Sequence, residues 1–170
     1  MPHCPKCGQE VAVEDNFCRQ CGLNLKDVEY KPEDEVRGLL IKRMEGIKNR
    51  DSQAITSLVD RERYTKFDDW PPFTRQGPEA LDREAEALEV LKEYEYKTSD
   101  WRVDLFDDAS VATFTVNYRG RIRDLSFDIT SRVTALLLKQ EDSWRIVHEH
   151  WSRFPGREQG IRRRRRWLPF

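Results

Sequence analysis

Four cysteines in two pairs constrain the fold of this chain more than any other feature. Cys4 and Cys7 form the first C-x-x-C pair, and Cys18 and Cys21 form the second after a spacer of ten residues. Each pair can turn two thiolates toward one point, and four thiolates complete the tetrahedron that zinc prefers in a closed structural site. So short a segment buries too little apolar surface to fold unaided. We therefore expect a Zn²⁺-dependent structural module over residues 1–25.

Two other uses of these cysteines are compatible with their spacing. A single C-x-x-C pair could be a redox dithiol, but two pairs with a short spacer favour a metal. Iron in a rubredoxin-like site takes the same four thiolates, so the ligands alone leave iron open. The segment 2–25, with its C-P-x-C-G and F-C-x-x-C-G halves, resembles the short zinc-ribbon at the N-terminus of many prokaryotic proteins. The resemblance implies a closed structural zinc.

The charge of this module bears on its partners. Within and just after the module there are three basic residues and four acidic residues. The basic residues are Lys6, Arg19 and Lys26, and the acidic residues are Glu10, Glu14, Asp15 and Asp27. A module without net positive charge is a poor binder of phosphates. We therefore expect a structural cap or a contact site for a protein partner.

Composition bounds the rest of the chain. Of 170 residues, 38% are hydrophobic, 36% are charged and 11% are aromatic, which is too many aromatics for a disordered chain. The longest apolar run, Ala135 to Leu138, is far shorter than a membrane span. The chain opens straight into the cysteine motif without a hydrophobic signal segment, so we expect a cytoplasmic protein without a transmembrane segment. Thiols stay reduced there, which also favours metal over disulfides.

The hydrophobic period divides the remainder into helices and then strands. After a linker over residues 26–32, three- and four-residue steps predict helices from about 33 to 48, from 52 to 59 and from 78 to 91. From Tyr94 the period becomes 2 and predicts long strands near residues 94–105, 111–118, 126–139 and 144–154, with a shorter one at 64–69. Helices followed by antiparallel strands indicate an α+β domain, with one curved sheet over a helical face.

The last two strands resemble the SnoaL-like branch of the nuclear-transport-factor-2-like superfamily. The chain reads Arg132-Val133-Thr134, then Lys139, then W-R-I-V-H-E-H-W-S over residues 144–152, which matches the family's pattern there. The ending also resembles the association domain of calcium/calmodulin-dependent kinase II. Over residues 33–155 the resemblance implies a cone whose sheet and helices enclose a pocket, commonly in a homodimer or larger ring. It fixes no reaction, because the superfamily contains isomerases, cyclases, dehydratases, ligand binders and assembly domains.

Strict alternation along the last strand would gather polar groups on one face. It would align Trp144 and Ile146 with the histidines, and leave Val147, Glu149 and Trp151 opposite. The pocket candidates are therefore Arg132, Thr134, His148, His150 and Ser152. They could bind a small anion or move a proton. Alternatively, the histidines are hydrogen-bonded core or interface residues. Zinc binding by His148 and His150 is a third option, but no third ligand is identifiable.

Asp68 and Asp69 are adjacent carboxylates that could act as a base. Ketosteroid isomerase, a member of the same superfamily, uses an Asp base with an oxyanion hole of Tyr and protonated Asp. Asp68 and Asp69 lie before the third helix, roughly where a base might sit, but the first helix holds no tyrosine. Adjacent charged residues rarely enter a pocket together, so we expect this pair to be a solvated turn.

The end of the chain is a basic tail over residues 156–170. It carries six arginines against one glutamate, and the rest of the chain is mildly acidic. Arginines can contact nucleic-acid phosphates, and an aromatic ring can stack on a base. The contact candidates are Arg162, Arg163, Arg164, Arg165, Arg166 and Trp167. The alternative is a mobile tail, or one that packs on an acidic neighbouring subunit.

These observations favour a non-enzymatic protein of two modules. The zinc-ribbon would be a structural or protein-contact element, and the SnoaL-like domain would form a homodimer and hold a small ligand, with an anion as one candidate. The first alternative is a proton-transfer enzyme, an isomerase, dehydratase or cyclase, that uses the same pocket. The second is a nucleic-acid-associated protein that acts through the tail.

Overall fold

The computed structural model describes most of the two modules and a short piece of the tail. The described residues are 4, 6, 7, 9, 11, 12, 14–26, 31–141, 143–154 and, for the backbone alone, 162–163.

Three helices precede the long strands, and local signals explain their ends. Helix α1 (Pro32–Asn49) has proline in its first turn, followed by acidic side chains that suit the positive end of the helix dipole. Helix α2 (Ser52–Ser57) is capped by Asp51, whose carboxylate accepts the backbone N–H of Ala54 at 2.9 Å. Helix α3 (Glu79–Val90) begins after Pro78. The three expected helices are thus present in order.

The strands form one curved sheet. Their bounds are β1 Thr65–Phe67, β2 Arg75–Gln76, β3 Leu91–Phe106, β4 Ala109–Ile122, β5 Leu125–Gln140, β6 Ser143–Arg153 and β7 Arg162–Arg163. The order across the sheet is β2-β1-β6-β5-β4-β3, and β7 pairs with the start of β5. All strand pairs are antiparallel except β1 with β6, which are parallel. The fold is α+β, as the sequence predicts.

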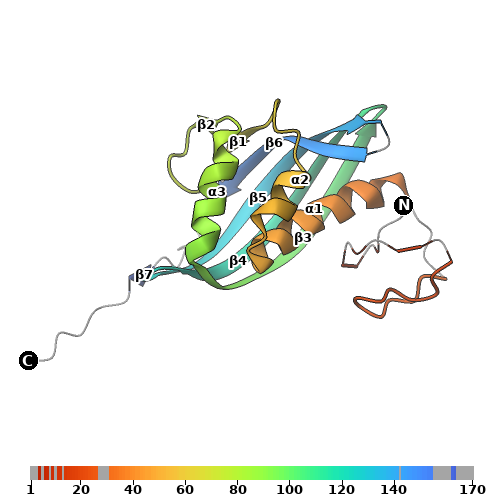
Figure 1. Cartoon of the computed structure of the whole chain (residues 1–170), viewed down its shortest axis with the longest axis horizontal. Coiled ribbons are helices and arrows are strands. Elements are labelled where there is room, and N and C mark those ends of the chain that lie inside the picture. Colours follow the sequence, from red (N-terminus) through yellow and green to blue (C-terminus); the bar gives the residue numbers. More distant parts are fainter. Residues whose placement is uncertain are drawn as a thin grey trace, which may run out of the picture.

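Helices α1 and α3 cover one face of this sheet (Figure 1). Val36, Leu40 and Met44 of α1 join one apolar core with Leu81 and Leu88 of α3 and with the inward side chains of the sheet. The inward residues of β4 are spaced by two, as a half-buried strand requires. Among the described residues, no helix lies over the opposite face (Figure 1).

A β-bulge in β6 changes which side chains face the core. Leu136 and Leu137 of β5 pair with His148 and Ile146, so Val147 is an extra residue in β6. Ile146 is bridged to Val59, whereas residues 148–150 pair with β1, so the bulge lies where β6 changes neighbours. After the bulge the alternation is reversed.

The expected grouping of β6 is therefore wrong beyond Ile146. Trp144 and Ile146 face the core, as do Glu149 and Trp151, while His148 is half-buried and His150 is exposed. Strict alternation predicted the opposite partners, because it could not anticipate one inserted residue.

The N-terminal module has its own small core. Cys4, Val11, Cys18 and Leu25 are buried together, apart from the core of the sheet. Phe17 and Asn24 form an antiparallel bridge, the one pairing assigned within the described part of this module. In Figure 1 the module lies beside α1.

Candidate metal centre and ligand cavity

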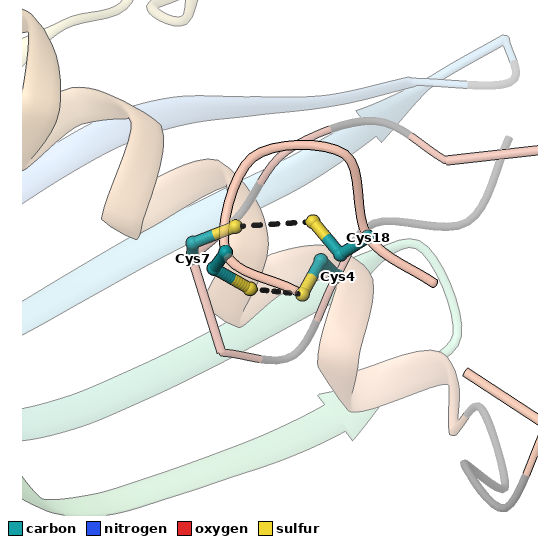
Figure 2. Close-up of side chains that lie close together, drawn as sticks. Cys4, Cys7 and Cys18 are labelled. Carbon is teal, nitrogen blue, oxygen red and sulfur yellow. Dashed lines mark hydrogen bonds between the residues drawn. The ribbon is translucent and has the colours of Figure 1, made fainter. Parts of the chain in front are cut away.

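The four cysteines converge on one point. Their sulfur atoms all lie within 4.8 Å of one another, and the Sγ atoms of Cys4 and Cys21, and of Cys7 and Cys18, are 3.5 Å apart. Figure 2 shows Cys4, Cys7 and Cys18 with their sulfurs gathered in this cluster. Zinc at about 2.3 Å from each sulfur would place the sulfurs about 3.8 Å apart in a tetrahedron. The spacing fits one tetrahedral metal ion with no open position.

A cavity of about 190 Å³ lies between α3 and the covered face of the sheet. Its lining is mostly apolar and aromatic, with polar groups from the segment that follows β1. The lining residues are Ile47, Lys66, Asp68, Asp69, Trp70, Pro71, Gln76, Ala80, Arg83, Glu84, Ala87, Leu88, Leu91, Tyr94, Tyr118, Ile122, Phe127 and Trp151. An apolar hollow with a few convergent polar groups is the usual form of a small-molecule site.

Asp69 is the most deeply buried acid of this lining, with 4% of its surface exposed. Its Oδ2 accepts hydrogen bonds from the hydroxyls of Tyr118, at 2.7 Å, and Ser131. The indole N–H of Trp70 donates in turn to the Tyr118 hydroxyl at 3.0 Å. Burial raises the pKa of Asp69, and the nearby Asp68 carboxyl adds to this, although the two hydroxyl donors oppose it.

Lys66 and Asp68 form an ion pair in the same cavity. The Lys66 ammonium lies 2.8 Å from Asp68 and 4.0 Å from Glu84, and it lies over the Trp151 ring at 5.6 Å. Burial would lower the pKa of Lys66, but Glu84 and Asp68 hold it well above its ordinary value. Lys66 is therefore a fixed cation rather than a neutral nucleophile.

A second buried ion network adjoins the cavity through Glu84. Arg43, with 1% of its side chain exposed, contacts Glu84 and Glu149 at 2.8 Å each. The Tyr64 hydroxyl donates to Glu149 at 2.5 Å, and the Trp151 indole donates to it at 3.4 Å. Arg43 thereby joins α1 to α3 and to β6.

The expectation of a solvated Asp68–Asp69 turn is wrong. Asp69 is buried in the cavity wall and Asp68 is bound to the buried Lys66 ammonium. The hydroxyl partners of Asp69 lie 49 and 62 residues farther along the chain, so no local pattern could reveal them. The tyrosines of the cavity, Tyr94 and Tyr118, come from strands rather than from the first helix.

The pocket candidates from the sequence lie away from this cavity. Arg132, Thr134 and His150 are exposed on the uncovered face, and His148 and Ser152 are half-buried. None of the five is among the lining residues. For the three residues of β6 the reversed alternation explains this, because it turns Glu149 and Trp151 inward in their place. Arg132 and Thr134 of β5 pair with Ser152 and His150, so all five lie on the same face.

The residues on the uncovered face contact one another. The His148 Nδ1 atom lies 2.8 Å from the Thr65 hydroxyl, and the Phe67 ring contacts both histidine rings at centroid distances of 6.1 and 5.4 Å. Partial burial lowers the pKa of His148, and His150 lowers it further. Within the described residues the only potential metal cluster is that of the four cysteines, so no third ligand joins the histidines.

Comparison with known proteins assigns both modules. A zinc-ribbon domain model matches residues 3–25, and a SnoaL-like domain model matches residues 37–156, more than half of the chain. The chain belongs to the SnoaL-like family. It carries a zinc-ribbon ahead of the SnoaL-like domain, as the sequence motifs predict.

Solved structures support the fold at low identity. A protein of the NTF2-like family from Streptomyces avermitilis is 16% identical, with a TM-score of 0.64 over 72% of this chain and 95% of that one. The CaMKII hub of S. rosetta is 18% identical, with a TM-score of 0.62 over 75% of this chain and all of that one. Identities this low show the fold alone.

A curated relative matches a shorter stretch. Protein YjdM of Escherichia coli is 35% identical over 63 residues, which are 35% of this chain. The chain spans about half the length of that relative, at 55%.

Two further expectations concern the tail and the membrane. The backbone of Arg162–Arg163 forms β7, which pairs with the start of β5, whereas the tail side chains and residues 164–170 lie outside the described residues. Binding of nucleic acid by the tail stays a prediction. Among the described residues, no helix is long and apolar enough to cross a membrane.

Proposed function

We propose that the SnoaL-like domain is a small-molecule binding domain whose ligand occupies the cavity beneath α3, and that the zinc-ribbon is a structural zinc module. The carrying observation is a pair of polar groups that line the cavity without a hydrogen bond to another described residue. Gln76, with 5% of its surface exposed, and the Tyr94 hydroxyl both line the cavity, and neither side chain has a hydrogen bond to another described residue. Neither group is among the fully buried polar atoms that lack a partner, so solvent reaches both, and a ligand in the cavity would take the place of that water.

The size of the cavity supports a ligand of one ring. An apolar cavity of about 150 Å³ is enough to hold benzene. At about 190 Å³, this cavity has room for one six-membered ring with a short polar substituent. The ring would pack against aromatic side chains of the lining.

A proton-transfer enzyme in the same cavity is the alternative. It would depend on Asp69 rather than on the histidines, because Asp69 lines the cavity and has a raised pKa. Turnover that is abolished in Asp69→Asn and kept in His148→Ala would favour this alternative over plain binding.

We also propose that the uncovered face of the sheet pairs two copies of the chain. Phe67, with 37% of its surface exposed, lies there with the histidine pair. An exposed aromatic ring in contact with other rings is typical of an interface. The histidines would then be interface residues.

The binding of a ligand in the cavity is tested with a substitution that fills the cavity with a larger side chain. Ala87→Leu adds a branched side chain inside it, while Ala85→Leu makes the same change on the side of α3 that faces a different groove. Titration calorimetry with benzyl alcohol should show binding to the wild type and to Ala85→Leu, and at least about tenfold weaker binding to Ala87→Leu. Equal affinity in all three proteins would refute the proposed cavity.

Dimerisation is tested at Phe67. Phe67→Glu places a charge on the proposed interface, whereas Phe106→Glu changes an equally aromatic, 60% exposed residue at the end of β3. Sedimentation velocity should show a dimer for the wild type and Phe106→Glu, and a monomer for Phe67→Glu. A monomeric wild type at high concentration would contradict this interface.

A further inference from the structure

The buried charges beside the cavity do not balance. Arg43 pairs with Glu84 and Glu149, and Lys66 pairs with Asp68 and again with Glu84. Two buried cations thus serve three carboxylates. None of the ion pairs within the described residues reaches Asp69, which is a fourth carboxyl in the same region.

Among the described residues, two hydroxyl groups donate to Asp69, and both of them reach the same oxygen, Oδ2. Burial in this environment favours the neutral acid, which is why its pKa is raised. A cation placed in the cavity would pair with the ionised Asp69 carboxylate, which none of the cations among the described residues contacts.

The rest of the lining suits an ammonium compound. Lys66 already lies over the Trp151 ring, and Arg153 lies over the Trp70 ring at 5.2 Å, so the walls accept cations on their faces. Tyr94 and Tyr118 offer two more aromatic faces. Independently of the acidic residues, the unpartnered Gln76 amide presents a carbonyl oxygen that could accept an ammonium N–H.

We infer that the cavity takes a small amine, whose apolar ring fills the hollow and whose ammonium group lies between Asp69 and Gln76. This inference rests on the proposed binding function, and it narrows the ligand from any small molecule with one ring to a small amine. It replaces the anion expected from Arg132 and the histidines, which lie on the other face.

Binding of an amine is coupled to a proton. In the free protein Asp69 keeps its proton to a higher pH than an ordinary aspartic acid, and the ammonium group of the ligand would favour its ionised form. Amine binding should therefore release a proton, and the affinity should rise as the pH rises through the pKa of Asp69. The titratable and charged groups that share this cavity or contact its wall are Lys66, Asp68, Arg83, Glu84, Tyr94, Tyr118 and Arg153.

The test compares two probes that differ in charge alone. Benzylamine and benzyl alcohol have nearly the same shape, and titration calorimetry near neutral pH measures both on the wild type and on Asp69→Asn. Asp82→Asn is the matched control, because Asp82 lies on the exposed side of α3 with 66% of its side chain accessible. We expect the wild type and Asp82→Asn to prefer benzylamine by about tenfold or more, and Asp69→Asn to lose that preference while keeping its affinity for benzyl alcohol.

The outcomes separate this inference from the function on which it rests. Equal affinity of the wild type for both probes, or a preference that survives Asp69→Asn, overturns the amine and leaves a binding cavity. Failure of both probes to bind overturns the cavity itself. Titrations of the wild type at a series of acid pH values, each in two buffers of different ionisation heat, provide a readout without a variant. Proton release should appear as the pH falls toward the pKa of Asp69, and with benzylamine alone. Absence of that release also overturns the inference.

Discussion

Arg43 is the single residue that connects most of the elements around the cavity. Its guanidinium group, buried on α1, contacts the carboxylates of Glu84 on α3 and Glu149 on β6. The sequence shows Arg43 only as a polar residue among the apolar residues of an amphipathic helix, because its partners are 41 and 106 residues away. The same separation hides the roles of Tyr64 and Asp69.

Replacing Arg43 should be far more harmful than replacing an exposed cation of the same helix. Arg43→Met leaves Glu149 without its ion-pair partner and leaves Glu84 with Lys66 alone, at 4.0 Å, which should cost about 3–5 kcal/mol in the free energy of unfolding. Lys48→Met removes an exposed pair with Glu95 and should cost less than about 1 kcal/mol. Urea unfolding of the two variants measures the difference. Similar losses would show that the buried network contributes little.

Because of Glu149, the stability of the folded state should depend on pH in the acid range. Burial alone would raise its pKa, but Arg43 and Lys66 lower it to about 2 from an ordinary value of 4.5. A carboxylate with a depressed pKa stabilises the folded state above its unfolded pKa, and this contribution disappears as the pH falls. We predict a loss of roughly 3 kcal/mol from this group between about pH 4.5 and pH 2.

The measurement is urea unfolding at a series of acid pH values. In Glu149→Gln the side chain cannot titrate, so stability should fall less steeply with acid over the same range. Parallel pH profiles for the wild type and the variant would contradict the assignment.

At the scale of elements, the sequence predicts the positions of the helices and strands well. It predicts less well which side chains of a strand face the core. Pro32, Asp51 and Pro78 act on their own helix ends, so local reading locates α1, α2 and α3. The bulge at Val147 instead depends on the strands that β6 meets on its outer edge. No local pattern specifies those neighbours, so strict alternation assigns the residues of β6 beyond Ile146 to the wrong faces.

The bulge should be essential to the domain. Deleting Val147 would restore strict alternation, so that Glu149 would turn out of the core and a histidine would turn into it. We expect that variant to lose cooperative unfolding and its near-ultraviolet circular dichroism. Val147→Ala keeps the inserted residue and should remain folded, with a loss of at most about 2 kcal/mol. A well-folded deletion variant would show that the register of β6 is not fixed by the bulge.

At the scale of the whole molecule, the two modules have separate cores and should depend differently on metal. The described part of the zinc-ribbon buries four hydrophobic residues, two of which are cysteines, whereas the SnoaL-like domain has an extensive core. The ribbon should therefore unfold when its metal is removed, and the SnoaL-like domain should not.

Limited proteolysis with trypsin tests this difference. After chelation, cleavage should become rapid at Lys6, Arg19 and Lys26 of the ribbon, while the SnoaL-like domain persists as a resistant fragment. Added Zn²⁺ should restore protection and added Mg²⁺ should not, because thiolates prefer the softer ion. Cleavage that is unchanged by chelation would indicate a ribbon that folds without metal.

The cavity beneath α3 is the central claim, and a heavy-atom ligand locates it most directly. Crystals soaked with 3-bromobenzyl alcohol would reveal the bromine by its anomalous signal. The account predicts a single strong peak among Ala87, Leu88 and Tyr94, between α3 and the sheet. A peak on the uncovered face beside Phe67 and His148, or none at saturating ligand, would contradict it.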